Sequence, residues 1–379
     1  MAAASILIKP ASANCNIDCA YCFYKCLSSR REEYSKGFMR QETLRALVEN
    51  AAAYGDDLIA FAFQGGEPTL CGVDFFREAV RLQQEYRRPG QVVENSIQTN
   101  GLLLDEEWAK FLAEEDFLGG ISLDGPKKIH DRYRKDASGR GTFAKVMQSI
   151  SLLRRYGVRF NILTVVTEEA AQKASYLYDF YKRNGFDYIQ LIPCMDESGR
   201  GQSACANTSA VTPDSYGRFL CEIFDRWYAD FDKGANMDIR MFSNLAQMAA
   251  GYPAEECGMS GQCSCYFVTE GDGSVYPCDF YCSDRWKLGT VKEPFAELAG
   301  SKKAQEFLAA SGGMAERCRV CPWFSLCRGG CRRRREEDGA GRYGCNQLCP
   351  SYEMFFAHTW ERLQKLGERI LRYYGPYKG

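Results

Sequence analysis

The most distinctive chemical feature of this sequence is a group of three cysteines near the amino terminus. Cys15, Cys19 and Cys22 have the spacing Cys-x3-Cys-x2-Cys and follow an apolar, strand-like run at residues 5–9. A 4Fe-4S cluster has four iron corners, which four thiolates normally close. Three ligands on one short loop would leave one iron open to a substrate or cofactor, so the spacing predicts a reactive cluster. A zinc knuckle is the alternative, although zinc pairs usually have a second pair or histidines nearby.

A second group of cysteines lies in the last third of the chain. Its core pattern is Cys-x2-Cys-x5-Cys-x3-Cys from Cys318 to Cys331, and further cysteines precede and follow it. Repeated short spacings supply complete four-thiolate sites. Zinc also accepts four thiolates, so the spacing alone leaves a zinc ribbon open. We expect the arginines at positions 328 and 332–335 to form a solvated face or to compensate thiolate charge, not to bind nucleic acid.

The composition favours iron and sulfide over other metals. The 379 residues include 19 cysteines but only two histidines, which is typical of thiolate-only ligation in a reducing compartment. The net charge of −1 gives no general reason to bind nucleic acid or an acidic membrane. No apolar run reaches the roughly 18 to 20 residues of a membrane span, and no signal-peptide pattern is present. We therefore expect a cytoplasmic protein.

Eight cysteines fall outside the metal-binding patterns, and most are expected to be buried thiols that pack as small apolar residues. They are Cys26, Cys71, Cys194, Cys205, Cys221, Cys265, Cys282 and Cys345.

Apolar runs alternate with segments of helical periodicity over the first half of the chain. Strands are predicted at residues 5–9, 58–63, 92–98, 119–123, 159–166 and 188–192, and helices at 40–53, 73–86, 105–113, 143–156 and 170–184. This alternation predicts parallel strands with right-handed crossovers. Six units are too few for a closed eight-stranded barrel, so we expect an α/β partial (β/α)6 barrel. A doubly wound sheet is the alternative, and it places ligands at the same strand ends.

Unusual residues follow three of the predicted strands. Gly65-Gly66-Glu67-Pro68 follows the second, Gln98-Thr99-Asn100-Gly101 the third, and Ser122-Leu123-Asp124-Gly125-Pro126 the fourth. Singly these are ordinary turn signals, but successive strand ends meet at one edge of a sheet, so together they predict a ligand site. A change in composition near residue 235 predicts three domains, at 1–234, 235–355 and 356–379, of which the second is rich in cysteine and the last is a helix.

These motifs resemble the radical SAM superfamily, in which S-adenosylmethionine (SAM) chelates the fourth iron of a three-cysteine cluster. The second cysteine group resembles the SPASM extension of radical SAM enzymes that modify peptides, which holds two auxiliary 4Fe-4S clusters. The resemblance thus implies three 4Fe-4S clusters and SAM. By position, the first auxiliary cluster would be held by Cys257, Cys263, Cys278 and Cys331, and the second by Cys318, Cys321, Cys327 and Cys349. Both would be closed and suited to electron transfer.

Together with Ile8-Lys9-Pro10, Arg134-Lys135-Asp136 and residues 274–281, the motifs are similar to those of the anaerobic sulfatase-maturating enzymes over almost the whole chain. Those enzymes oxidise an active-site cysteine or serine of a sulfatase to Cα-formylglycine. The resemblance implies that a 5′-deoxyadenosyl radical removes a β-hydrogen, followed by deprotonation and by electron transfer through the auxiliary clusters. It also implies that Asp279, directly after Cys278, is the proton acceptor.

The resemblance assigns further roles. Tyr21, Gly66, Ser122, Arg134 and Met195 would contact SAM, with methionine at a position where the family is expected to have leucine. The candidates for holding the substrate peptide are Tyr24, Gln64 and Asn100. The expected partners are a sulfatase segment with the pattern Cys/Ser-x-Pro-x-Arg and an electron donor such as flavodoxin or ferredoxin.

Two other functions are compatible with parts of the sequence. A related radical SAM-SPASM enzyme would form a thioether or carbon-carbon crosslink in a ribosomally made peptide and would share every cluster motif. We expect no leader-peptide-binding domain before residue 1, which favours sulfatase maturation. A zinc scaffold without catalysis is the second alternative, but it does not explain a three-ligand loop followed by glycines at strand ends.

Overall fold

The computed structural model describes residues 4–196, 207–337 and 343–377. The chain forms two compact units, each built from segments that are distant in sequence. Unit 1 contains Met1–Leu123, His130–Ile162 and Cys265–Phe307, and unit 2 contains Asp124–Ile129, Leu163–Ser264 and Leu308–Gly379. Because these units do not follow sequence order, they do not test the boundaries predicted at residues 234 and 355, which stay predictions.

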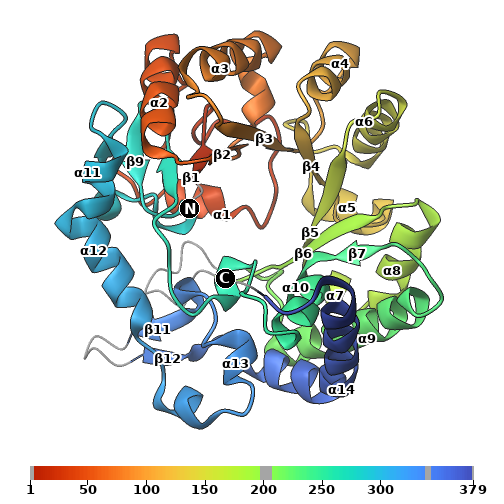
Figure 1. The fold of residues 1–379 in the computed structure, drawn as a ribbon. Coiled ribbons are helices and arrows are strands. Elements are labelled where there is room, and N and C mark those ends of the chain that lie inside the picture. The colour runs from red at the N-terminus through yellow and green to blue at the C-terminus, as the bar shows by residue number, and fades with distance from the viewer. Residues whose placement is uncertain (1–3, 197–206, 338–342, 378–379) are drawn as a thin grey trace. The chain divides into compact units, whose positions relative to one another are not determined.

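Unit 1 is organised around strands in the order β10-β9-β8-β1-β2-β3-β4 (Figure 1). The pairs from β8 through β1, β2 and β3 to β4 are parallel, whereas β9 is antiparallel to both β8 and β10. The strands are β1 (Ala4–Ile8), β2 (Leu58–Phe63), β3 (Val92–Thr99), β4 (Leu118–Ser122), β8 (Phe267–Thr269), β9 (Ser274–Tyr276) and β10 (Gly289–Thr290). The carboxyl ends of β1 to β4 consequently meet at one edge, where the glycine-rich turns were predicted.

The outer side of these strands in Figure 1 is lined by α2 (Gln41–Tyr54), α3 (Val73–Tyr86), α4 (Glu106–Glu114), α6 (Phe143–Arg155) and α11 (Phe295–Gly300). The short helix α1 (Phe23–Ser28) follows the cysteine loop and lies on the inner side. Fully buried aromatic rings join the outer helices to the sheet, with Phe76 of α3 4.9 Å from Phe63 and 5.1 Å from Trp108 between ring centroids. The predicted start of α4 is confirmed, since the side chain of Asp105 accepts a hydrogen bond from the Trp108 amide.

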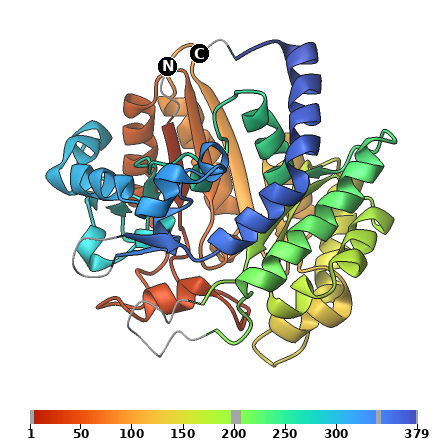
Figure 2. The same ribbon diagram turned by 90° about the horizontal axis from the view of Figure 1, so that it is seen from below.

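Unit 2 contains a parallel pair, β6 (Tyr188–Pro193) with β7 (Asp238–Ile239), and a group of packed helices. Figure 2 shows α14 running alongside α9. The aromatic face of α9 is core, because Phe224 is fully buried and its ring packs against Phe355 of α14, with 5.6 Å between the ring centroids. The other elements are α7 (Glu168–Ala171), α8 (Ala174–Arg183), α9 (Pro213–Phe231), α10 (Arg240–Ala249), α13 (Phe324–Cys327), β11 (Arg335–Glu337), β12 (Tyr343–Asn346) and α14 (Cys349–Tyr374).

Three elements include residues of both units: α5 (Lys127–Tyr133), β5 (Phe160–Val166) and α12 (Lys302–Ala309). All six predicted strands are present with small shifts at their ends. The helix predicted at 170–184 is instead two, α7 and α8, because Lys173 leaves the helical conformation with φ −131° and ψ 37°. Residues 196–213 are rich in glycine and serine and lack periodicity, which predicts a loop, but this segment falls largely outside the described residues. None of the helices in the described part of the chain combines the length and apolar character of a membrane span.

Candidate active site

The three-cysteine loop follows β1 and is tied to the ends of β2 and β3. The Glu67 amide donates to the carbonyl of Asn14 at 2.8 Å, and the Asn100 side chain donates to that of Asn16 at 2.7 Å. Asn100 also directs its Nδ2 toward Cys15 Sγ at 3.9 Å. Because a cluster thiolate carries negative charge, a donor amide beside its sulfur is a favourable neighbour.

The other side of the loop is held by residues 133–135. The amides of Asp18 and Ala20 donate to main-chain carbonyls of this segment at 2.8 and 3.0 Å. From the same segment, Arg134 is buried and directs Nη1 toward Cys19 Sγ at 3.9 Å. The loop is therefore fixed along its length with polar donors beside two of its three sulfurs, and this donor set fits a thiolate-bound cluster.

Glu67 ties the strand ends together beneath this loop. Its buried carboxylate accepts hydrogen bonds from the amide and hydroxyl of Thr69, the hydroxyl of Thr99 and the amide of Asn100, at 2.6 to 3.1 Å. Burial raises the pKa of Glu67, although these donors oppose the shift. The Gly-Gly-Glu-Pro motif thus uses its glutamate to hold two strand ends in register.

Gly66 allows the cysteine loop to approach the end of β2. Its φ is +55°, and an added Cβ would lie 2.3 Å from the Asn14 carbonyl oxygen and 2.7 Å from that of Ser12. Both obstacles are main-chain atoms, so they cannot move aside as a flexible side chain would. A glycine is required here for its backbone conformation and for the space it leaves.

We predict that Gly66→Ala displaces the three-cysteine loop and lowers both the melting temperature and the iron bound per chain. Gly157→Ala is the matched control, since Gly157 also has a positive φ, +72°, but an added Cβ meets nothing within 4 Å. Gly157→Ala should lower the free energy of unfolding only by the conformational cost of a positive φ, about 1–2 kcal/mol. Gly66→Ala should lower it by at least about twice that amount. Equal shifts in anaerobic thermal unfolding, with equal iron content, would contradict the prediction.

Four of the five predicted SAM contacts lie in unit 1. The Arg134 guanidinium lies over the Tyr21 ring, 5.5 Å from its centroid, and Gly66 packs against the cysteine loop. The Ser122 hydroxyl accepts a hydrogen bond at 3.0 Å from the amide side chain of Gln98 on β3. The fifth, Met195, is a half-buried residue of unit 2, after β6. The role of each in SAM binding stays a prediction.

Asp279 lies in unit 1 and is tied to the helix that follows the three cysteines. Only 4% of its surface is exposed, and its Oδ2 accepts a 2.6 Å hydrogen bond from the hydroxyl of Tyr24 in α1. That hydroxyl accepts in turn from Gln64 Nε2 at 2.9 Å. Burial, followed by the nearby Asp279 carboxylate, raises the pKa of Tyr24 well above its usual value, so this residue acts as a neutral donor. Tyr24 and Gln64, predicted to hold the substrate peptide, thus also orient the predicted base.

The sequence did not identify a buried charge network around Asp279. Lys9 Nζ lies 3.1 Å from Asp279 Oδ1 and 3.5 Å from Glu270 Oε1, and Arg31 Nη2 lies 2.8 Å from the same Glu270 oxygen. Burial disfavours the charge of Lys9, but Asp279 and other neighbours outweigh it and raise its pKa. Burial likewise opposes the Glu270 charge, yet Lys9 and Arg31 lower the pKa of Glu270. The one sequence signal for this charge network was a lysine at the end of an apolar strand.

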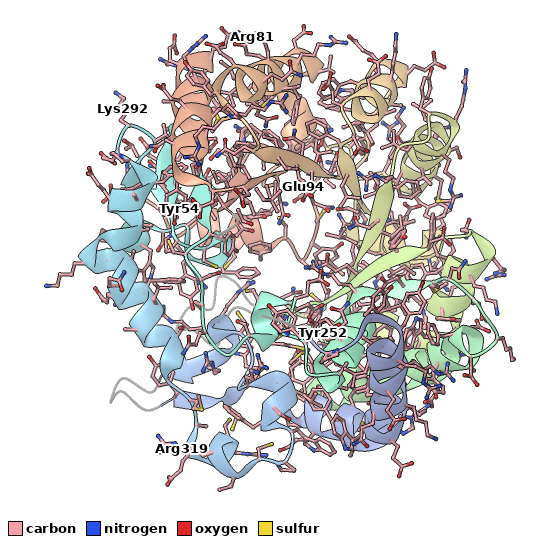
Figure 3. All side chains as sticks on the ribbon, viewed as in Figure 1. Tyr54, Arg81, Glu94, Tyr252, Lys292 and Arg319 are labelled. Atoms are coloured by element: carbon pink, nitrogen blue, oxygen red, sulfur yellow. The ribbon has the colours of Figure 1, made fainter. Side chains whose placement is uncertain are left out.

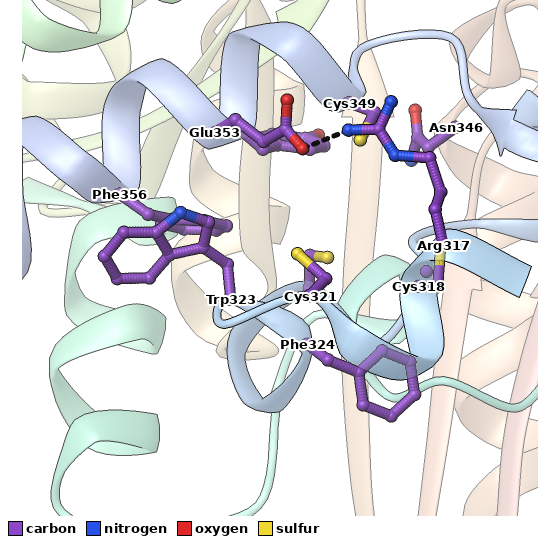
Figure 4. Close-up of a pocket in the computed structure, with 12 residues that line it drawn as sticks. Arg317, Cys318, Cys321, Trp323, Phe324, Asn346, Cys349, Glu353 and Phe356 are labelled. Carbon is purple, nitrogen blue, oxygen red and sulfur yellow. Dashed lines mark hydrogen bonds and ion pairs between the residues drawn. The ribbon is translucent and has the colours of Figure 1, made fainter.

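Four thiols of the predicted second auxiliary site line one pocket of unit 2, on the α13 side of α14 (Figure 4). They are Cys318, Cys321, Cys327 and Cys349. Trp323 and Phe356 cover one side of this pocket, and the Arg317–Glu353 ion pair covers another. Arg319, between the first two thiols, points outward at the periphery (Figure 3). A pocket lined by four sulfurs and capped by aromatic rings fits a closed cluster.

Three of the four predicted ligands of the first auxiliary cluster lie in unit 2. Cys257, Cys263 and Cys331 interact electrostatically with one another, and burial, followed by these neighbours, raises the pKa of Cys257 to about 11. Metal binding at such thiols must therefore release protons. The fourth predicted ligand, Cys278, is a residue of unit 1.

One arginine of the predicted basic run is structural. Arg335 is 5% exposed and donates to main-chain carbonyls at Ser311 and Gly313, and the Ser311 hydroxyl accepts from the Cys263 amide at 3.0 Å. The prediction of a solvated face is wrong for this residue, because its guanidinium is buried and supports the turn at Ser311. Burial raises the pKa of Cys263, and the charge of Arg335 opposes that rise, as expected of a compensator of thiolate charge.

Cys345 is a fifth thiol beside the second auxiliary site. It hydrogen-bonds with Cys318 and interacts electrostatically with Cys349, so five thiols are available for four ligand positions. The prediction that such cysteines are mostly buried apolar thiols holds for Cys194 and Cys282, at 3% and 0% exposure. It is wrong for the other described ones, because Cys71, Cys221, Cys265 and Cys345 are half-buried and Cys26 is half-buried and disulfide-bonded. Cys205 lies outside the described residues.

We predict that Cys349→Ala removes about four irons per chain, whereas Cys345→Ala retains the full complement. The reason is that Cys349 lines the four-sulfur pocket and Cys345 does not. The two variants make the same chemical change four residues apart, so each controls for the other. Iron and sulfide analysis after anaerobic reconstitution is the measurement. If Cys345→Ala lost iron and Cys349→Ala did not, Cys345 would be the ligand and Cys349 would not.

No group of three or more histidine, cysteine or acidic side chains in the described residues is gathered closely enough to hold a metal ion. Thiolates of a four-iron cluster each bind a different iron and need not converge on one point.

Comparison with known proteins identifies the class. Residues 10–180 match the model of the radical SAM superfamily, and residues 257–322 match that of SPASM, an iron-sulfur cluster-binding domain. The protein is thus a radical SAM enzyme with a SPASM domain, and the predicted fold class and cofactors, SAM and iron-sulfur clusters, are confirmed over the zinc alternatives. More narrowly, the chain belongs to the family of anaerobic sulfatase-maturating enzymes.

Relatives of both known types match almost the whole chain. The cysteine-type anaerobic sulfatase-maturating enzyme of Clostridium perfringens is 43% identical over 97% of this chain and 99% of its own length. The serine-type enzyme of Bacteroides thetaiotaomicron is 31% identical over 98% of this chain and 93% of its own length. The solved structure of native anSMEcpe with bound AdoMet and Cp18Cys peptide superposes with a TM-score of 0.91, at 42% identity over 97% of this chain and 100% of that chain.

Proposed function

We propose that this protein oxidises an active-site cysteine of a sulfatase to Cα-formylglycine. The observation that carries the proposal is the buried Asp279 carboxylate, tied by a 2.6 Å hydrogen bond to Tyr24 in the helix that follows the three cluster thiols. A proton acceptor is thereby joined to the loop that would generate the radical. The reaction needs both, because the substrate must lose a hydrogen atom, a proton and an electron.

The residues divide the chemistry as follows. Cys15, Cys19 and Cys22 would hold a 4Fe-4S cluster that, with SAM bound, would supply the 5′-deoxyadenosyl radical needed to remove a hydrogen atom from the β-carbon of the target cysteine. Asp279 accepts the proton that the substrate radical loses, which is general-base catalysis at a buried carboxylate. Loss of one further electron leaves a thioaldehyde, and water converts it to the aldehyde with release of hydrogen sulfide.

The predicted SAM contacts have a physical basis in this arrangement. Arg134 and Tyr21 present a cation and a ring face beside the cluster loop, and Gly66 lies directly against the main chain of that loop. The thiols of the two auxiliary sites would hold closed clusters, whose chemistry is to accept and pass electrons. Asn100 already hydrogen-bonds with Glu67 and with Asn16 of the cysteine loop. We therefore propose that Asn100 contacts the peptide only at the outer edge of this hydrogen-bond network.

A cysteine target is favoured over serine because the cysteine-type relative is 43% identical and the serine-type relative 31%. We propose that the substrate is an extended sulfatase segment with the pattern Cys-x-Pro-x-Arg and that a flavodoxin or ferredoxin supplies electrons. A cytoplasmic location fits the thiol-rich sequence, since free thiols persist in a reducing compartment.

The test is anaerobic incubation of reconstituted enzyme with dithionite, SAM and an 18-residue peptide carrying Cys-x-Pro-x-Arg, read by mass spectrometry. We expect the cysteine to be converted to the aldehyde, with one 5′-deoxyadenosine formed per product. The matched peptide with serine should react more slowly. An intramolecular crosslink without aldehyde would replace this proposal with the crosslinking peptide maturase that shares the cluster motifs.

A further inference from the structure

Lys9 occupies an unusual position for a lysine. It directly follows β1 and precedes the three-cysteine loop, yet only 2% of its surface is exposed. Its main-chain amide donates to the carbonyl of Thr269 at 2.8 Å, which fixes the root of the side chain on β8. A buried ammonium must be paired to be tolerated, so its partners indicate what it is for.

The side chain of Lys9 ends between two carboxylates. Its Nζ lies 3.1 Å from Asp279 Oδ1, 3.5 Å from Glu270 Oε1 and 4.4 Å from the centroid of the Tyr24 ring. Arg31 pairs with Glu270 at 2.8 Å and donates to the carbonyl of Cys282 at 2.6 Å. Among the described residues, Lys9 is therefore the cation within ion-pair distance of Asp279, while Glu270 has a second cation of its own.

Gly65 makes this path of the lysine side chain possible. An added Cβ at Gly65 would lie 2.7 Å from both Cγ and Cε of Lys9, so the aliphatic part of the lysine lies directly against this glycine. The two glycines of the Gly-Gly-Glu-Pro motif thus serve different neighbours. Gly66 admits the main chain of the cysteine loop, and Gly65 admits the lysine that reaches the base.

We infer that Lys9 is a positioning residue for Asp279, an inference that rests on the proposed function. The Tyr24 hydroxyl holds Oδ2 and the Lys9 ammonium holds Oδ1, so the two contacts fix the plane of the carboxylate. Glu270, itself paired with Arg31, is the second carboxylate beside the ammonium. A large part of the catalytic effect of a base comes from its orientation toward the proton that it accepts. Without Lys9, substrate radicals would form but would be deprotonated inefficiently.

The test compares Lys9→Gln with wild-type protein, with Lys110→Met as the control because Lys110 forms an exposed ion pair in the same unit. Lys9→Gln keeps a side-chain donor, one bond shorter than that of lysine, but lacks the charge. We expect full iron content, SAM cleavage within about twofold of wild type and an unchanged peptide KM, with aldehyde formed per 5′-deoxyadenosine reduced at least about tenfold. Lys110→Met should match wild type in every measurement.

A double-mutant cycle with Asp279→Asn separates positioning from general damage. If Lys9 acts through Asp279, Lys9→Gln should lower product no more than about twofold further when Asp279 is already asparagine. The inference would be overturned if Lys9→Gln lowered aldehyde formation by the same factor in the wild-type and the Asp279→Asn backgrounds. It would also be overturned if the single variant Lys9→Gln formed as much aldehyde per 5′-deoxyadenosine as wild-type protein. Loss of iron or of SAM cleavage in Lys9→Gln would also overturn it, because Lys9 would then be structural. Wild-type product from Asp279→Asn alone would instead refute the proposed base.

Discussion

Replacing Asp279 by asparagine should leave iron content and SAM cleavage intact and lower aldehyde formation by roughly 10² to 10⁴-fold. Asparagine has nearly the same shape and can still accept the hydrogen bond from Tyr24, so the surrounding structure should persist. What it cannot do is take up the substrate proton. 5′-Deoxyadenosine would then be formed without product, and the ratio of the two, measured by chromatography and mass spectrometry, is the decisive quantity.

Asp284→Asn is the control for that experiment. It makes the same change five residues later, at an exposed carboxylate whose recorded contact is with the Glu32 amide at 3.1 Å. Its product yield and coupling ratio should match those of wild-type protein. Wild-type yield from Asp279→Asn would remove Asp279 from the reaction and leave the structure without its proposed base.

The second large effect is expected from replacing Cys15, Cys19 and Cys22 together by alanine. SAM cleavage should fall to background, while about eight irons per chain remain on the two auxiliary clusters. The reason is that, in the predicted ligand sets, the loop of Cys15, Cys19 and Cys22 is the one that leaves an iron without a protein ligand. Iron analysis, with electron paramagnetic resonance of the reduced protein, measures both results.

Cys71→Ala provides the comparison for the triple variant. Cys71 is half-buried at the end of the turn that begins with the Gly-Gly-Glu-Pro proline, and it lies outside every predicted ligand set. It should retain all three clusters and SAM cleavage. Persistent SAM cleavage in the triple variant would mean that the open cluster is held elsewhere.

The strands and the cluster loop could be predicted because their signals are local. Apolar β-branched runs predicted β2 at 58–63 and β6 near 188–192, and the spacing of Cys15, Cys19 and Cys22 needs eight consecutive residues. The positions of Gly157 and Gly185 at helix ends also follow from local geometry, since both have positive φ.

The charge network around Asp279 could not be predicted because its members have no common periodicity. Lys9 and Glu270 directly follow the adjacent strands β1 and β8 but are far apart in sequence, and only the sheet order makes them neighbours. The role of Arg335 was hidden for a related reason. Four arginines precede or adjoin it in a run that is typical of a surface, and its burial depends on the turn at Ser311.

The choice among the five thiols near α14 shows another limit. Spacing selected Cys318, Cys321 and Cys327 readily because they lie within ten residues. Cys345 and Cys349 are separated from them by a segment that the structure describes only in part, and both approach the same site. Sequence spacing therefore cannot decide whether Cys345 or Cys349 is the fourth ligand, because the fold brings both to the same site. Iron analysis of the two alanine variants can decide it.

The position of β1 between β2 and β8 has a consequence for biosynthesis. During translation, β2 can pair with β1 as soon as residue 63 has emerged, but β8 is not available until residue 269. In the interval the nascent chain exposes a row of unpaired main-chain groups along β1, which is an edge that other chains can join. A shortened chain ending at residue 234 would keep that edge permanently and would be prone to aggregation. Full-length synthesis is therefore the natural protection of the strand that leads into the cluster loop.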